Sequence, residues 1–270
     1  MNILTFDIED WFHTLENRQR YSGHIWDKLP SKVVENTSRI LAMLDKRGLK
    51  ATFFILGWVA QKHPELIREI HSKGHEIAAH SYWHHNPHRI RISDFEKDLK
   101  HCLSAIQDIT GEKVRAYRAP GFNLRLNDHR VFDILAAQGI VVDSSVQLRL
   151  SSDKIPMIIS TSSNRIIEFP LITTPLGVPY SGGGYFRALP YSLLKYLFKQ
   201  QDYHLLYFHP RDFDTEYPGS NLFSFWRNQM NRWNTGKCML HLEDIITEYK
   251  TSTLCKAARP YLTESSPKEN

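Results

Sequence analysis

Residues 51–79 read ATFFILGWVAQKHPELIREIHSKGHEIAA, and this stretch predicts the fold. Ala51–Leu56 is a short apolar run of the kind that forms a buried strand. A helical pattern begins at Pro64 and ends before Gly74, both of which are typical positions for these residue types. His75–Ala79 then forms a second short strand. A strand, a helix and a further strand in this order predict a parallel sheet with helices outside it.

The same alternation continues on both sides of this unit. Ser31 is a predicted cap of one helix, and Ser93–Glu96 is a predicted capping box at the start of another. About seven strands joined by helices favour an α/β fold with a closed or nearly closed (β/α) barrel over an open doubly wound sheet. The predicted strands are Asn2–Phe6, Ala51–Leu56, His75–Ala79, Val114–Tyr117, Ile140–Val142, Ile166–Phe169 and Leu205–Phe208.

The chain shows no repeat and no linker that would divide it. We therefore expect a single domain over residues 1–262, followed by a polar tail at 263–270. Two polar stretches, Leu148–Arg165 and Pro175–Arg187, are predicted to be long functional loops.

Composition excludes several classes of protein. The 270 residues contain 41% apolar residues, which excludes global disorder, and 34 Lys+Arg against 29 Asp+Glu give a mildly basic net charge of +5. The sequence contains no basic block with interleaved aromatic residues, which is the pattern that would indicate a nucleic-acid partner. The sequence shows neither a secretory signal nor an apolar run of about 20 residues, so we expect a cytoplasmic protein without a transmembrane segment. Cys102, Cys238 and Cys255 are predicted to be reduced thiols.

Polar residues follow the predicted strands, where parallel α/β proteins carry their chemistry. Asp7, Glu9 and Asp10 leave the first strand together, and such close carboxylates repel unless a cation lies among them. His80 and His84 follow another strand at a spacing that lets both imidazoles reach one zinc, iron or cobalt ion. An acidic loop and a surface histidine cluster are the alternative interpretations.

Three further strand ends carry single candidates. Arg118 is suited to balance a buried carboxylate, or it is a surface arginine beside a turn. Asp143 is suited to orient a histidine, or it caps the next segment. His209 ends an apolar strand and is either a general acid or a structural hydrogen-bonding group.

Five motifs occur in order between Thr5 and His209, namely Thr-Phe-Asp, His-Ser-x-x-His, Arg-x-Pro-x-Phe, Asp-x-Ser and Leu-x-x-His. Together they closely resemble the motifs of the polysaccharide deacetylases of the nodulation-protein homology type, carbohydrate esterase family four. The start Thr-Phe-Asp-x-Glu-Asp-Trp-Phe resembles a branch associated with bacterial surface polysaccharides. The resemblance implies a distorted (β/α) barrel and a divalent metal, commonly zinc. It also implies hydrolysis of an N-acetyl group on an amino sugar of a surface polysaccharide, glycolipid or precursor.

By the same resemblance, Asp7 is the general base and His80 and His84 are metal ligands. Arg118 positions the base. The family pattern has two adjacent aspartates, whereas Ile8 separates the acids here, so Glu9 and Asp10 remain alternatives for the third ligand.

The remaining roles concern the acid and the substrate. His209 resembles the general acid, and Asp143 resembles the carboxylate that tunes it. Tyr82, Pro120 and Phe122 are predicted substrate contacts, with the backbone near Tyr82 as a predicted oxyanion donor. Other aromatic side chains near the expected mouth are candidates for stacking on sugars, namely Trp11, Phe12, Trp83, Tyr185 and Phe186.

The expected partner is an N-acetylated amino sugar, anionic or lipid-linked at the inner face of a membrane, and the oligomeric state is left open. Two competing functions are a metal-dependent amidohydrolase of a small cyclic amide or ureide, and a catalytically inactive carbohydrate-binding relative.

Overall fold

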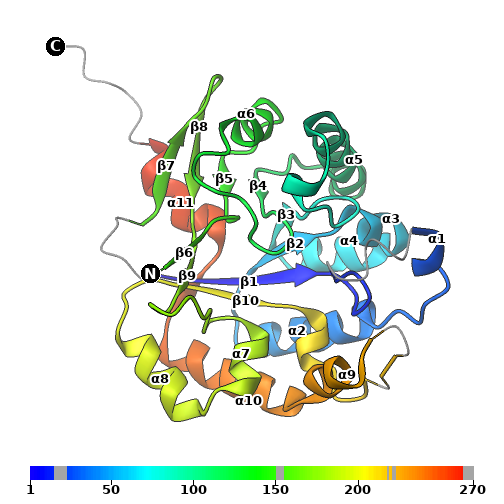
Figure 1. Ribbon diagram of the computed structural model, residues 1–270, viewed down its shortest axis with the longest axis vertical. Coiled ribbons are helices and arrows are strands. Elements are labelled where there is room, and N and C mark those ends of the chain that lie inside the picture. The colour runs from blue at the N-terminus through cyan, green and yellow to red at the C-terminus, as the bar shows by residue number, and fades with distance from the viewer. Residues whose placement is uncertain (15–22, 150–154, 218, 221–222, 264–270) are drawn as a thin grey trace.

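A computed structural model describes residues 1–14, 23–149, 155–217, 219–220 and 223–263 (Figure 1). Its main sheet has the strand order β10-β1-β2-β3-β4-β5-β8-β7, and β11 pairs with β1. Each of the seven predicted strands overlaps one of the strands from β10 to β8, and these seven run parallel, whereas β7 is antiparallel. The predicted distorted (β/α) barrel is therefore confirmed. The strands are β1 (Asn2–Ile8), β2 (Thr52–Ile55), β3 (Glu76–Ala79), β4 (Ala116–Tyr117), β5 (Val142–Asp143), β7 (Met157–Ser160), β8 (Arg165–Glu168), β10 (His204–Phe208) and β11 (Thr251–Ser252).

Helices surround this curled sheet (Figure 1). Two further strands, β6 (Gln147–Arg149) and β9 (Leu171–Thr173), form a small parallel sheet of their own. No helix among the described residues is long and apolar enough to cross a bilayer. The helices are α1 (Gly23–Trp26), α2 (Val33–Lys46), α3 (Gly57–Lys62), α4 (Pro64–Ser72), α5 (Ile92–Thr110), α6 (His129–Ala137), α7 (Gly183–Ala188), α8 (Tyr191–Lys199), α9 (Phe225–Arg232), α10 (Thr235–Glu248) and α11 (Leu254–Thr263), with 3-10 turns η1 (Pro87–Arg89) and η2 (Pro210–Phe213).

The barrel interior is an apolar core of its own. It takes one buried residue from each of the seven parallel strands, together with Leu254 and Ala258 of α11, which lies against β1, β5 and β8. Since side chains alternate along a strand, Ile3, Thr5 and Asp7 of β1 share the interior face. The apolar end of the barrel is thus covered by α11, and the polar residues collect at the other end. The strand residues are Ile3, Phe54, Ala78, Ala116, Val142, Ile167 and Leu205.

Two predicted helix starts are wrong. Ser31 does not cap α2, because its hydroxyl donates to Asp10 across 2.5 Å. The capping box at Ser93–Glu96 is absent, because α5 already begins at Ile92 and Ser93 lies inside its first turn. The start of α2 is therefore set by a contact with Asp10, which is distant in sequence. The start of α5 lies one residue before the predicted capping residue.

The two predicted loops contain regular structure. β7 and β8 form a hairpin within and after the first, closed where the Thr161 N–H donates to the Asn164 carbonyl. The second contains α7. Residues 150–154 of the first loop and 264–270 of the predicted tail lie outside the described residues.

Candidate active site

The carboxyl ends of the parallel strands surround a cavity of about 290 Å³. β1 brings Asp7 and Glu9 to it, β3 leads into His80 and His84, and β10 leads into His209. Its lining is Asp7, Glu9, Thr14, His80, His84, Gly121, Phe122, Gln147, Leu171, Pro179, Tyr207, His209, Arg211 and Arg227. The acidic and imidazole groups predicted from separate strand ends therefore meet at one place.

Asp7 forms a buried ion pair with Arg118. Nη1 of Arg118 lies 2.6 Å from Oδ1 of Asp7 and 2.9 Å from Oγ1 of Thr5. The other Asp7 oxygen, Oδ2, points to Nε2 of His209 at 3.9 Å. One oxygen of Asp7 is thus held by a cation while the other faces the cavity.

The surroundings of Arg118 fix its position. Its Nε and Nη2 donate to the carbonyl and hydroxyl of Ser144, and its guanidinium lies 4.0 Å from the ring centroid of Phe54. The side chain is fully buried. A buried guanidinium with every side paired is suited to balance one carboxylate and is costly to leave alone.

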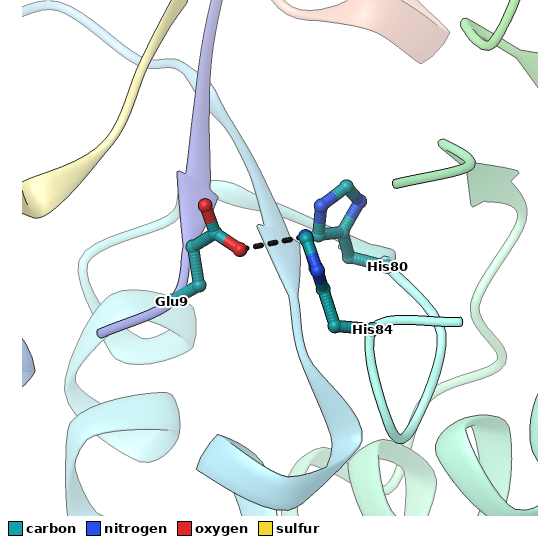
Figure 2. Close-up of side chains that lie close together, drawn as sticks. All are labelled: Glu9, His80 and His84. Carbon is teal, nitrogen blue, oxygen red and sulfur yellow. Dashed lines mark ion pairs between the residues drawn. The ribbon is translucent and has the colours of Figure 1, made fainter. Parts of the chain in front are cut away.

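Glu9, His80 and His84 point toward one another (Figure 2). They place one ligand atom each within 4.8 Å of one another. All three residues are buried. His80 donates from Nδ1 to the carbonyl of Arg118 at 2.9 Å, which directs Nε2 toward the group. Ser81 and His84 have φ values of 65° and 58°, a left-handed conformation that curls this loop and that L-residues rarely adopt.

The chemistry of this group fits a divalent cation. Oε2 of Glu9 lies 2.7 Å from Nε2 of His84, yet Oε2 accepts no hydrogen bond. Burial lowers the pKa of His80 to about 4, so its imidazole is neutral at physiological pH. Burial raises the pKa of Glu9, but the neighbouring His84 and Arg211 outweigh this effect and hold the pKa well below its usual range. A carboxylate and neutral imidazoles are the donors that zinc takes.

Asp10, the alternative ligand, is used elsewhere. Its carboxylate accepts hydrogen bonds from Ser31 and from the backbone N–H groups of Lys32 and Val33, at the start of α2. Asp10 thus caps the helix from outside it, and burial raises its pKa despite these donors. Of the two carboxylates that the sequence left open, the structure brings only Glu9 to the histidines.

His209 is oriented by Asp212, a residue that the sequence analysis missed. Oδ2 of Asp212 lies 3.2 Å from Nδ1 of His209 and also accepts its backbone N–H at 2.9 Å. Arg187 contacts the other oxygen of Asp212 at 3.2 Å. Burial raises the pKa of Asp212, but His209 and Arg187 outweigh it and lower the pKa strongly. Nε2 of His209 is left to face Asp7 and Glu9.

Asp143 does not fill the role predicted for it. Its carboxylate accepts from the Ser145 hydroxyl at 2.8 Å and lies against the buried Glu168. Burial and the neighbouring Asp143 raise the pKa of Glu168 well above its usual value, and burial raises that of Asp143. The two carboxyl groups therefore lie together beside the segment whose Ser144 holds Arg118.

Among the predicted substrate contacts, Phe122 lines the cavity. Tyr82 does not: its hydroxyl donates to Gln61, its ring stacks on His101, and its backbone N–H is already donated to Asp98. Pro120 is buried and also absent from the described lining. Of the three predicted substrate contacts, the structure therefore places only Phe122 on the cavity wall.

The other aromatic candidates also lie outside the described lining, and Trp11, Phe12 and Phe186 belong to the core. The sequence analysis missed Arg211, whose Nη1 lies 2.5 Å from Oε1 of Glu9. Asp212 and Arg211 directly follow His209-Pro210, so the turn after the last motif was the available signal.

Comparison with known proteins places this cavity in context. Residues 15–141 match the family model described as polysaccharide deacetylase, and residues 144–259 match a domain of unknown function, DUF3473. His80, His84 and Arg118 lie in the first segment, whereas His209 and Asp212 lie in the second. Both segments contribute strands to the same sheet.

Relatives with assigned names match part of the chain. A bifunctional xylanase/deacetylase of Pseudobutyrivibrio xylanivorans is 26% identical over 152 residues, which are 56% of this chain and 25% of that protein. A peptidoglycan-N-acetylglucosamine deacetylase of Bacillus cereus is 30% identical over 87 residues, 32% of each protein. The matches thus span about a quarter to a third of the length of these relatives.

Solved structures share the fold. A polysaccharide deacetylase structure from Mycobacterium smegmatis superposes with a TM-score of 0.66 at 18% identity, covering 100% of this chain and 92% of that one. A structure named Puue allantoinase superposes with a TM-score of 0.63 at 13% identity, covering 98% and 90%. At these identities the likeness is one of fold.

Proposed function

We propose that this chain, whose residues 15–141 match the polysaccharide deacetylase model, is a metal-dependent hydrolase of N-acetylated amino sugars. The substrate is a bacterial surface polysaccharide, a glycolipid or a precursor of these. The observation that carries the proposal is the convergence of Asp7, the Glu9–His80–His84 group and His209 on one cavity. We further propose that residues 1–262 act as one catalytic domain, because strands from both matched segments complete a single sheet.

Glu9, His80 and His84 would hold the metal, and zinc suits this donor set. Three protein ligands are typical of catalytic zinc, which keeps a position open for water or substrate. When bound, such an ion polarises a carbonyl and lowers the pKa of its water. The chain itself supplies the proton transfers.

Asp7 acts as the general base. Its Oδ2 faces the cavity while Oδ1 is paired with Arg118, so the carboxylate keeps its orientation and its charge is balanced. In this position Oδ2 takes the proton of the attacking water. Arg118 contributes by fixing the base.

His209 acts as the general acid. Asp212 fixes the ring through Nδ1 and balances the charge of the imidazolium, which leaves Nε2 to protonate the departing amine. An amide expels its amine only when the nitrogen is protonated, so this proton completes the hydrolysis. The acetyl group leaves as acetate.

We place the protein in a reducing compartment such as the cytoplasm, which the three unpaired cysteines support. A lipid-linked or anionic sugar precursor at the inner face of a membrane would be accessible there. Arg211 and Arg227 on the cavity wall suit an anionic group on the sugar or its carrier.

The test is acetate release by the zinc-loaded protein from N-acetylglucosamine oligomers, with allantoin as a competing ureide substrate. We expect acetate from the oligomers, loss of the rate on chelation and recovery with zinc. Ring opening of allantoin without acetate release would favour the amidohydrolase function. Bound zinc without turnover of either substrate would favour an inactive binding protein.

A further inference from the structure

Helix α9 presents an apolar face to solvent. Phe225, Trp226 and Met230 are 67%, 76% and 64% exposed, and Trp233 at its end is 60% exposed. At 100° per residue, the three helical residues fall within an arc of about 140°. None of the residues of α9 is buried. Contiguous exposed aromatic residues of this kind mark a surface that binds a membrane or another protein.

The polar face of the same helix is turned toward the protein. Asn228 bonds to the Tyr217 hydroxyl at 3.0 Å and to the N–H and carbonyl of Ser220. Arg232 donates from Nε to the carbonyl of Tyr217 at 3.1 Å. A helix that packs on a domain normally buries its apolar side, so α9 is held in the opposite orientation.

The helix is firmly attached in this orientation. Nη1 of Arg187 donates to the carbonyls of Met230, Asn231 and Trp233, which closes the carboxyl end of α9. The same guanidinium contacts Asp212, the partner of His209. The aromatic face is therefore a fixed part of the domain. Arg187 and Asp212 connect it to His209, the proposed acid.

Charge around α9 is one-sided. No Asp or Glu occurs between Glu216 and Glu243, whereas Arg227, Arg232 and Lys237 do. Exposed Trp and Phe with flanking Arg and Lys are the composition of helices that lie in the headgroup region of anionic bilayers. Glu216 lies 3.9 Å from Lys32 and from Arg39, which offset its charge.

We propose that the outer face of α9, residues 225–233, docks on an anionic phospholipid bilayer. Phe225, Trp226, Met230 and Trp233 enter the headgroup boundary, and the positive charge that flanks them attracts the surface of an anionic bilayer. Arg227 of the same helix lines the active-site cavity, so docking places the cavity beside the lipid surface. The inference rests on the surface of α9 and not on the proposed function, although it favours a membrane-attached substrate.

The test is sedimentation of the full chain with phosphatidylcholine vesicles, with and without phosphatidylglycerol. We expect binding to the anionic vesicles that weakens with salt. Loss of two interfacial Trp side chains in Trp226→Ser/Trp233→Ser should weaken binding about tenfold or more. Ile158→Ser is the matched control, because Ile158 is 52% exposed on β7, far from α9 in Figure 1, and binding should be unchanged.

A second measurement does not depend on the folding of the serine variant. Brominated lipid should quench the tryptophan fluorescence of the wild type through the exposed Trp226 and Trp233. Trp11, Trp26 and Trp58 are buried and should add little to the quenching. Trp226→Phe/Trp233→Phe should keep vesicle binding and lose most of the quenching. Absence of binding to both vesicles would overturn the proposal. So would a wild-type dimer that Trp226→Ser/Trp233→Ser converts to monomer, because a second copy would then cover this face.

Discussion

Asp7 and Arg118 stand at the exits of two parallel strands with side chains 4% and 0% exposed, whereas His209 stands beside a 3-10 turn with 18% of its side chain exposed. The proposed base is enclosed by strand register, because alternation along β1 alone places Asp7 inside the barrel. The proposed acid depends on a turn and on Asp212, which Arg187 connects to the surface helix α9.

The two matched segments contribute different residues to the cavity. The polysaccharide deacetylase segment carries two histidines of the metal group and the arginine that holds the base. The segment of unknown function carries the proposed acid, its carboxylate partner and the exposed helix. Asp7 and Glu9 precede both segments, so the cavity is lined by residues from three parts of the chain.

The largest effect should come from removing the base or the acid. Either Asp7→Asn or His209→Gln should lower kcat for acetate release by a factor on the order of a hundred to ten thousand. Only Asp7→Asn should also destabilise the fold, because it leaves the Arg118 charge buried and unbalanced, at a cost of about 3–5 kcal/mol. Urea denaturation beside the acetate assay measures both.

His209→Gln is the matched control for stability, because the buried Asp212 that it leaves behind is still paired with Arg187. If the two variants lose the same free energy of unfolding, the contrast between an enclosed base and an edge-placed acid is wrong. If a folded Asp7→Asn protein keeps most of its rate, Asp7 is not the base.

A smaller effect should distinguish the two aspartates assigned to His209. Asp212→Asn should lower kcat about 10- to 100-fold, as loss of a partner of a site histidine does. It should also move the alkaline limb of the pH profile to lower pH, since the imidazolium loses its counter-charge. Asp143→Asn should leave that limb in place. The opposite outcome would restore Asp143 as the partner of the acid.

The smallest effect concerns the buried pair of Asp143 and Glu168, which supports the base half. The raised pKa of Glu168 means that the folded state holds a proton there that the unfolded state releases. Its stabilising contribution is complete below the ordinary pKa of Glu and is lost as pH rises through the folded value.

The free energy of unfolding of the wild type should therefore fall as pH rises above the ordinary pKa of Glu, and Glu168→Gln should flatten this dependence. Its amide keeps the oxygen that accepts from the Ser145 and Val146 N–H groups and needs no proton. Chemical denaturation over this pH range measures the difference. Parallel curves for the two proteins would show that the pair is not protonated.

Much of the fold was predictable because it follows local patterns. The seven apolar runs and the glycine-ended helices between them are periodic, and they specify a parallel barrel. Helix starts were less predictable, since α2 is capped by Asp10, 22 residues before Lys32, across space and not by its neighbour Ser31. β7, the antiparallel partner of β8, was missed because its polar surroundings resemble a loop.

The site residues, too, were predictable only where a local pattern marks them. Each of five candidates lies at or just after the end of a strand, namely Asp7, His80, His84, Arg118 and His209. Glu9 could not be chosen over Asp10, since which carboxylate faces the histidines depends on how the chain turns after Ile8. Asp212 was missed because its role arises from the turn at Pro210, where the His209 N–H and ring both reach one carboxylate.

The most direct test of the proposed metal site compares the zinc content of Glu9→Gln with that of Asp10→Asn. Both are measured by mass spectrometry after equilibration with zinc. The two acids are adjacent and buried alike, so the pair controls for charge and position. The account predicts that Glu9→Gln loses at least about 100-fold in zinc affinity, and that Asp10→Asn binds zinc as the wild type does. Zinc retained by Glu9→Gln and lost from Asp10→Asn would contradict the metal group on which the proposed hydrolase rests.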